Sequence, residues 1–193
     1  PRYVLSVIGR QKDRLISPEE MEEDSRSASD YRIVQIARVY GIYQKRLKDN
    51  NALDFDDILY VTVKLLQQDR EVREYYQRKF HYVLVDEYQD TNYAQYLILK
   101  KLAQFHHNIC VVGDDSQSIY AFRGAKIENI LNFKKDYPEC RVFRLERNYR
   151  STSTIVDAAN SIIEHNDGRI PKKCYAVGGT GEKIKLLKAY TEQ

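Results

Sequence analysis

The sequence predicts an α/β protein in which a mainly helical segment precedes a parallel sheet with flanking helices. Two patterns support this fold class. Over roughly the first 80 residues, apolar side chains recur at helical spacing between residues that favour helix starts. After that, short β-prone runs at 81–85, 108–112 and 141–145 alternate with helix-length segments, as expected for parallel strands joined by crossovers.

The helical segment contains several helix-start signals. The run Ser17–Glu20 carries a capping-box pattern with proline at the first helical position. An amphipathic helix is expected over 31–48. Asp54 and Asp69 are expected to cap two further helices, because their side-chain oxygens accept hydrogen bonds from free N–H groups. In the last helix, three side chains are expected to face inward: Val72, Tyr76 and Phe80.

The sheet segment is expected to contain helices over 92–105 and 127–137, each between two β-prone runs. Beyond the third run, 152–166 is predicted to form a helix that stops near Gly168, since glycine is common just after a helix. The alternation in 183–190 predicts one more strand.

The composition is that of a soluble globular chain. Of the 193 residues, 42% are hydrophobic and 31% charged, and no apolar run approaches the roughly 18 residues of a membrane span. The formal charge of +3 is too small to identify a nucleic-acid-binding protein. The three cysteines suggest neither a disulfide framework nor a zinc site, and free thiols fit the cytoplasm. The start at Pro1 has no signal-peptide layout, so we expect a boundary inside a longer protein.

Two acidic residues, Asp86 and Glu87, directly follow the run 81–85. In open parallel sheets, ligands bind beyond the carboxyl ends of the strands. In phosphoryl transfer, one such carboxylate contacts Mg²⁺ and a neighbour orients or deprotonates the attacking water. The alternative is structural: Asp86 ends a strand and Asp90 caps the next helix.

A long polar loop, 113–125, follows the second β-prone run and carries Tyr120 and Phe122 beside Arg123. A purely structural loop has little reason to expose two aromatic rings next to an arginine. Because stacking of a base on an aromatic ring contributes roughly 1–3 kcal/mol, the loop is a candidate for binding single strands. The alternative is that both rings pack beneath the loop as a small cluster.

The segment 145–151 follows the third β-prone run and places Tyr149 next to Arg150. Arginine forms forked, charge-assisted hydrogen bonds with phosphate, and a tyrosine ring can stack on a base. The alternative is an exposed charge pair at a helix start, capped by Ser151 or Thr152.

These segments resemble helicase motifs of the UvrD/Rep/PcrA family of superfamily 1 DNA helicases. Residues 85–92 look like its second motif, 113–125 like its third and 145–151 like its fourth, in the family's order and at suitable spacing. Residues 53–59 also resemble the segment that re-enters the first motor domain after its helical insertion. The likeness covers essentially the whole chain.

The resemblance implies an incomplete RecA-like sheet of the P-loop NTPase type. Residues 1–52 would be part of the helical insertion domain. Residues 53–147 would be the rear part of the first RecA-like motor domain, with the second and third motifs. Residues 148–193 would begin the second RecA-like domain, with the fourth motif.

The resemblance also implies residue roles, with ATP and Mg²⁺ as cofactors. Asp86 and Glu87 would hold Mg²⁺, and Glu87 would be the catalytic base for water attacking the γ-phosphate. Gln117 would sense that phosphate, Tyr149 would stack near the adenine, and Arg150 would reach the γ-phosphate as an arginine finger. Tyr120 and Phe122 would contact bases of single-stranded DNA, and Arg123 would touch DNA or brace the loop.

The chain departs from the family pattern at several positions. Many relatives carry tryptophan where Phe122 stands, and the phenylalanine ring offers a smaller stacking face. Ser116 and Ala121 stand where relatives often carry aspartate and glycine.

A phosphate-binding loop needs Gly-x-x-x-x-Gly-Lys-Ser/Thr. In 178–184 the last glycine is followed by Glu182 rather than lysine, so we expect a glycine turn there and an inactive isolated chain.

The implied function is that of an ATP-dependent DNA helicase. It would couple Mg-ATP hydrolysis to movement along single-stranded DNA and to unwinding at single/double-strand junctions, with 3′-to-5′ polarity, in repair or replication. Two alternatives stay open: the motor portion of a helicase–nuclease subunit, and a degenerate, non-catalytic DNA-binding or docking module. RNA in place of DNA also stays open, because base stacking is indifferent to the sugar. No membrane partner is expected.

Overall fold

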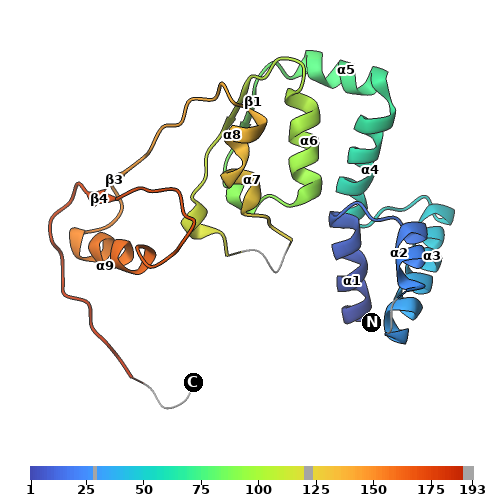
Figure 1. Ribbon diagram of the computed structural model, residues 1–193, viewed down its shortest axis with the longest axis horizontal. Helices are drawn as coiled ribbons and strands as arrows, with labels where there is room; N and C mark the ends of the chain where they lie inside the picture. Colours follow the sequence, from blue (N-terminus) through green and yellow to red (C-terminus); the bar gives the residue numbers. More distant parts are fainter. Residues whose placement is uncertain (28–29, 120–123, 189–193) are drawn as a thin grey trace. The chain divides into compact units, whose positions relative to one another are not determined.

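The computed structural model describes residues 1–27, 30–119 and 124–188 (Figure 1). The chain divides into two compact units, Pro1–Tyr137 and Pro138–Gln193. The first unit contains a helical segment followed by a parallel strand pair, and the second contains a separate strand pair and a helix. Among the described residues, no helix is long and apolar enough to cross a membrane.

Three helices open the first unit: α1 (Arg2–Asp13), α2 (Pro18–Ser25) and α3 (Tyr31–Asp49). The predicted capping box of α2 is confirmed, since Ser17 Oγ accepts from the Glu20 N–H and Glu20 Oε2 accepts from the Ser17 N–H. The predicted helix over 31–48 is α3. No side-chain cap marks the start of α1, so the sequence carries no start signal for it. The helices enclose a buried cluster: Ile8, Met21, Ile36, Ala37 and Tyr40.

Helices α4 (Phe55–Gln68) and α5 (Arg70–Lys79) begin at the predicted caps, Asp54 and Asp69. Asp54 Oδ1 accepts from the Asp57 N–H, and Asp57 Oδ2 accepts from the Asp54 N–H. This reciprocal pair satisfies two N–H groups that the first turn of a helix leaves without partners. The helix starts here are therefore determined by residues next to them in the sequence.

The inward face of α5 differs from the prediction. Tyr76 and Phe80 are 36% and 42% exposed, and their rings stack on each other with centroids 5.8 Å apart. Gln77 is the buried residue instead, and its Nε2 donates to the Lys101 carbonyl oxygen at 2.6 Å. That carbonyl lies near the end of a neighbouring helix, where carbonyl groups lack intrahelical donors, so an amide side chain occupies the position expected for an apolar one.

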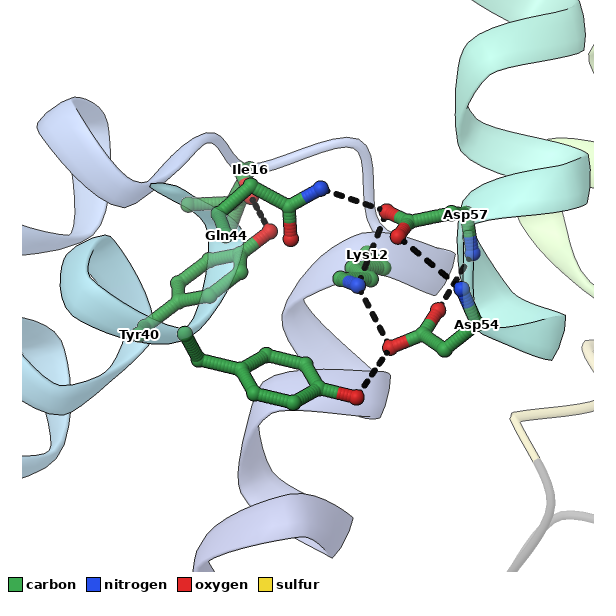
Figure 2. Close-up of polar contacts among 7 residues, drawn as sticks. Lys12, Ile16, Tyr40, Gln44, Asp54 and Asp57 are labelled. Carbon is green, nitrogen blue, oxygen red and sulfur yellow. Dashed lines mark hydrogen bonds and ion pairs between the residues drawn. The ribbon is translucent and has the colours of Figure 1, made fainter. Parts of the chain in front are cut away.

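A buried lysine joins α1 to the first turn of α4 (Figure 2). Lys12 Nζ lies 2.7 Å from Asp54 Oδ2 and 2.8 Å from Asp57 Oδ1. The Tyr43 hydroxyl donates to Asp54 Oδ2, and Gln44 Nε2 donates to Asp57 Oδ1, both at 2.9 Å. The two aspartates thus cap α4 and pair with the lysine at the same time.

The predicted parallel pair is formed by β1 (Val83–Val85) and β2 (Ile109–Val111), with α6 (Tyr93–Ala103) as the crossover between them. Val85 pairs with Val111, so both strands end at the same edge. Helix α6 packs against α4, α5 and β1. Together with the preceding helices, this pair confirms the predicted α/β class.

The predicted helix over 127–137 is divided into two short helices, α7 (Glu128–Leu131) and α8 (Phe133–Asp136). The break is at Asn132, whose φ of −94° and ψ of 0° lie outside the helical range. Asparagine competes with the helix for backbone hydrogen bonds, which makes it a weak interior residue.

The predicted strand at 141–145 is wrong. These residues belong to the second unit and join no strand in the described part of the chain. Val142, Phe143 and Leu145 are 64%, 79% and 80% exposed. β propensity reflects packing and hydrogen bonding with a neighbouring strand, so a β-prone run without such a neighbour stays irregular.

In the second unit, β3 (Arg147–Asn148) pairs in parallel with β4 (Tyr175–Ala176), and α9 (Ser153–Ile163) lies between them in the sequence. Helix α9 confirms the helix predicted over 152–166. The predicted strand at 183–190 is wrong for 183–188, which form no strand, and its last two residues lie outside the described residues.

Candidate functional site

The turn after β1 presents two carboxylates to solvent. Asp86 and Glu87 are exposed, while the next residue, Tyr88, is only 2% exposed. Glu87 has φ 49° and ψ 41°, a left-handed conformation that is uncommon outside glycine and that occurs often at functional sites. Asp86 Oδ1 accepts from the Glu87 N–H at 2.9 Å and stabilises this turn.

Tyr88 anchors the same turn to the residue that follows β2. Its N–H donates to the Val112 carbonyl oxygen at 2.9 Å, and its ring meets Phe133 edge-on, with centroids 5.7 Å apart. Burial raises the pKa of the Tyr88 hydroxyl. Because Tyr88 is fixed inside, the preceding carboxylates are held at the carboxyl end of the strand.

The alternative role for Asp90, as the cap of the helix that follows it, is wrong. The N-cap of α6 is Asn92, which forms a capping box with Gln95. Asp90 lies within the short 3₁₀ turn Tyr88–Asp90, and its Oδ1 is buried with no hydrogen-bond partner among the described residues. Asp90 therefore does not serve as the helix cap.

The loop after β2 holds Gln117 on a second short turn, Asp115–Gln117. Asp114 organises this turn: its Oδ1 accepts from the Ser116 N–H, and its Oδ2 accepts from Gln117 Nε2, both at 2.9 Å. Gln117 itself is exposed, so its amide is available to a ligand at the end of β2.

Gln89 joins the two loops. It is 1% exposed, its Nε2 donates to Glu87 Oε2 at 2.8 Å, and its Oε1 accepts from the Asp114 N–H at 3.0 Å. The structure therefore brings Glu87 and Gln117 into one hydrogen-bonded group through two residues that the sequence does not single out, Gln89 and Asp114. No local signal identifies this pair, because the contact depends on the parallel pairing of β1 with β2.

The far end of the second loop returns to the end of the first. Asn92 and Ala125 form an antiparallel bridge, and the Lys126 N–H donates to the Thr91 carbonyl oxygen at 3.0 Å. Asn92 Nδ2 also donates to Asp13 Oδ1 of α1 at 2.7 Å. Three predicted DNA contacts on this loop lie outside the described residues: Tyr120, Phe122 and Arg123.

Tyr149 and Arg150 belong to the second unit, between β3 and α9. Tyr149 is 75% exposed. Asn148 Oδ1 accepts from the N–H groups of Arg150 and Ser151, at 3.0 and 2.8 Å, and shapes the turn into the helix. Neither candidate side chain is buried.

The glycine-rich segment 178–181 forms a turn, as predicted. The carbonyl oxygens of Gly179 and Thr180 accept from the N–H groups of Ser153 and Thr154, at 3.1 and 3.3 Å. A phosphate-binding loop does the opposite, because its own N–H groups point at the phosphate. This turn therefore caps α9 and has the wrong polarity to hold a nucleotide.

The exposed acidic pair fits the needs of a magnesium ion that is shared with substrate phosphates. Oδ2 of Asp86 and Oε1 of Glu87 accept no hydrogen bond from the described residues. In the same part of the chain, no group of three or more His, Cys, Asp or Glu side chains could hold a metal ion. Mg²⁺ is usually held by one or two carboxylates together with water and phosphate oxygens, so two carboxylates are sufficient.

Two family models match the chain. The UvrD/REP helicase N-terminal domain matches residues 2–138, and the UvrD-like helicase C-terminal domain matches 143–193. Among curated relatives, the ATP-dependent DNA helicase PcrA of Staphylococcus aureus (strain Mu50) is 49% identical over 193 residues, which are 100% of this chain and 26% of the relative. The protein of the same name from Staphylococcus epidermidis (strain ATCC 12228) is 47% identical with the same coverage. The chain thus spans about a quarter of the length of these relatives.

Proposed function

Because the chain belongs to the UvrD/REP helicase family, we propose that it works within an ATP-dependent DNA helicase. Its short parallel strands and preceding helical segment fit an incomplete RecA-like fold. In this proposal, residues 1–52 belong to a helical insertion, 53–147 to the rear of a first motor domain and 148–193 to the start of a second. The observation that carries the proposal is the hydrogen-bonded group that links Glu87, after β1, to Gln117, after β2.

The proposed chemistry is hydrolysis of the γ-phosphate of ATP. Asp86 and Glu87 would hold Mg²⁺, which supplies positive charge against the phosphate oxygens. Glu87 takes a proton from the attacking water, because a carboxylate held at a fixed position is an effective general base. Gln117 senses the γ-phosphate through its exposed amide.

The second unit contributes two further groups in this proposal. Tyr149, with its exposed ring, stacks near the adenine, and Arg150 reaches the γ-phosphate. A guanidinium placed against the transferred phosphoryl group stabilises the charge that develops there. The Asn148 turn supports the proposal, since it fixes the backbone from which both side chains project.

The proposed nucleic-acid partner is single-stranded DNA, bound by Tyr120, Phe122 and Arg123. Hydrolysis would drive stepwise movement along the strand in the 3′-to-5′ direction and unwinding at single/double-strand junctions, in repair or replication in the cytoplasm. The relatives' printed name, ATP-dependent DNA helicase, supports DNA rather than RNA.

The phosphate-binding lysine loop is not part of these 193 residues, and the segment 178–184 does not replace it. The isolated chain should therefore hydrolyse ATP negligibly, and the activity test needs the longest natural protein that contains this chain. In that protein, Glu87→Gln should leave ATP binding within about twofold and lower the hydrolysis rate by about 100-fold or more, since a general base contributes that much.

Binding is measured with a fluorescent ATP analogue and hydrolysis by phosphate release. Glu71→Gln, on the exposed first turn of α5, is the matched control for loss of one acidic charge and should change neither quantity. Full hydrolysis by the Glu87→Gln protein would contradict the proposal that Glu87 is the general base. Robust Mg²⁺-dependent hydrolysis by the isolated chain would contradict the expectation that it is inactive.

A further inference from the structure

The buried side chain of Gln89 makes one hydrogen bond with each of the two loops of the site. Its Nε2 lies 2.8 Å from Glu87 Oε2, and its Oε1 lies 3.0 Å from the Asp114 backbone nitrogen. The side chain is 1% exposed, so water cannot readily replace either partner. Both ends of the amide are therefore used inside the protein.

The orientation of this amide follows from its neighbours. A backbone N–H can only donate, so the Gln89 atom that faces Asp114 must be the oxygen. The NH₂ group then faces Glu87, whose ionised carboxylate can only accept. A carboxamide supplies an acceptor to one loop and a donor to the other without having to bind a proton.

Packing around Gly113 holds the amide in place. A Cβ atom at Gly113 would lie 2.6 Å from Gln89 Oε1 and 2.9 Å from Ile130 Cδ1. The backbone carbonyl oxygen of Gln89 also accepts from Ser118 Oγ, at 3.4 Å. The amide is thus enclosed between the two loops and has little freedom to turn away from Glu87.

The contact continues from Gln89 to the exposed amide of Gln117. Asp114 donates its N–H to Gln89 and accepts from Gln117 Nε2 through Oδ2. Glu87, Gln89, Asp114 and Gln117 therefore form one continuous series of hydrogen bonds across the ends of β1 and β2. The series links the proposed base to the proposed γ-phosphate sensor.

We propose that Gln89 is a positioning residue for this site: its amide orients Glu87 for proton transfer and couples Glu87 to the Gln117 loop. The inference rests on the proposed hydrolytic function. Gln89 does not touch the reacting atoms, and it acts through the carboxylate that it holds. Groups of this kind that orient a reacting side chain typically affect activity by about 10- to 100-fold.

Gln89→Glu is the most informative variant. It keeps the size of the side chain and the acceptor for the Asp114 N–H, but it places a carboxylate oxygen against Glu87 in place of a donor. The two carboxylates repel each other, so Glu87 should leave the position in which the Gln89 amide holds it. At neutral pH, kcat should fall about tenfold or more while KM changes less than about twofold.

Gln89→Met is the matched control, because it keeps the volume and removes both hydrogen bonds without adding charge. It should lower kcat less than Gln89→Glu does, again with KM changed by less than about twofold. If Gln89 only braces the two loops, both variants lose stability in parallel with activity, and kcat and KM change to a similar extent; that result would overturn the inference. Gln89→Asn, which is too short to reach both loops, serves as the second variant if the glutamate protein does not fold; a kcat within twofold of the parent would likewise overturn it.

A double-variant cycle in the longest natural protein containing this chain separates this inference from the proposed function. If Gln89 acts through Glu87, adding Gln89→Met to Glu87→Gln should lower hydrolysis no further, because both changes act on the same interaction. Unchanged hydrolysis in Glu87→Gln alone would contradict the proposed function. Loss of hydrolysis in Glu87→Gln together with full activity in every Gln89 variant would contradict only the role of Gln89.

Discussion

The ammonium nitrogen of Lys12 lies 2.8 Å from a carboxylate oxygen of Asp57, and neither side chain has any solvent-exposed surface. Asp54 completes the group at 2.7 Å (Figure 2). Burial alone would raise the pKa of the Asp54 carboxyl, but hydrogen bonds from Lys12, the Asp57 N–H and Tyr43 outweigh it and lower that pKa. The contact between α1 and α4 thus depends on one buried cation between two buried or half-buried anions.

Lys12→Met should strongly destabilise the first unit. The substitution leaves two carboxylates without their cation in a site from which water is largely excluded, and breaking a buried ion pair in this way costs about 3–5 kcal/mol. Chemical denaturation followed by circular dichroism measures the loss. Arg70→Ala removes an exposed ion pair with Glu74 and should cause no measurable change. Equal effects of the two substitutions would contradict the structural role of the Lys12 group.

Asp13→Asn should stabilise the chain at neutral pH and lose that advantage in acid. Desolvation, followed by the charge of Asp56, raises the pKa of Asp13 to about 6. Because the folded value lies above the unfolded value of about 3.9, charged Asp13 costs stability above pH 6, and the cost disappears as the pH falls toward 4. Asparagine never carries this charge and can still accept from Asn92.

The expected gain for Asp13→Asn is on the order of 1 kcal/mol at pH 7.5, after allowance for solvent screening of a half-buried group. Free energies of unfolding at pH 7.5 and at pH 4.5 test it. Asp24→Asn, on the exposed side of α2, controls for loss of a surface charge. A difference between Asp13→Asn and the parent that is the same at both pH values would contradict the assignment.

Gly113→Ala should destabilise the site because the position has no space for a methyl group. The added carbon would lie 2.6 Å from Gln89 Oε1 and 2.9 Å from Ile130 Cδ1, and overpacking of this kind costs about 1–3 kcal/mol. Gly41→Ala is the matched control: its nearest neighbour is Pro18 Cβ at 4.0 Å, and inside α3 alanine should stabilise by about 0.5–1 kcal/mol. Denaturation of both proteins should therefore give shifts of opposite sign, and shifts of the same sign would contradict the packing at Gly113.

Phe122→Ala should weaken binding of single-stranded DNA by roughly 1–3 kcal/mol, the value of one base stacked on one ring. The prediction rests on the sequence motif, since Phe122 lies outside the described residues. Fluorescence anisotropy with a labelled oligonucleotide, in the longest natural protein containing this chain, measures the affinity. Phe105→Ala, an exposed residue just after α6, is the control and should leave the affinity unchanged. An unchanged affinity for Phe122→Ala would favour a ring packed beneath its own loop.

Elements determined by neighbouring residues were predictable from the sequence. The caps at Ser17, Asp54 and Asp69 match the structure because a cap and its first turn lie within a few residues of each other. The placement of the acidic turn after β1 and the loop after β2 at one edge of the sheet was also predictable, because parallel strands end at the same edge.

Features that depend on distant parts of the chain were not predictable. The buried Lys12 has the sequence context of an exposed lysine, and only the packing of α1 on α4 reveals its partners. Gln89 was missed for the same reason, since Asp114 lies 25 residues away. The β-prone run 141–145 failed as a strand because propensity alone supplies no neighbouring strand.

The most direct test of the central claim is steady-state ATP hydrolysis by the longest natural protein containing this chain, with and without single-stranded DNA. A nucleic-acid-driven motor couples the Gln117 loop to DNA bound by the same loop, so the account predicts strong stimulation by DNA that disappears in Glu87→Gln. Hydrolysis that is the same with and without DNA would contradict that coupling. Failure to detect any hydrolysis under both conditions would contradict the motor itself and favour a DNA-binding or docking module.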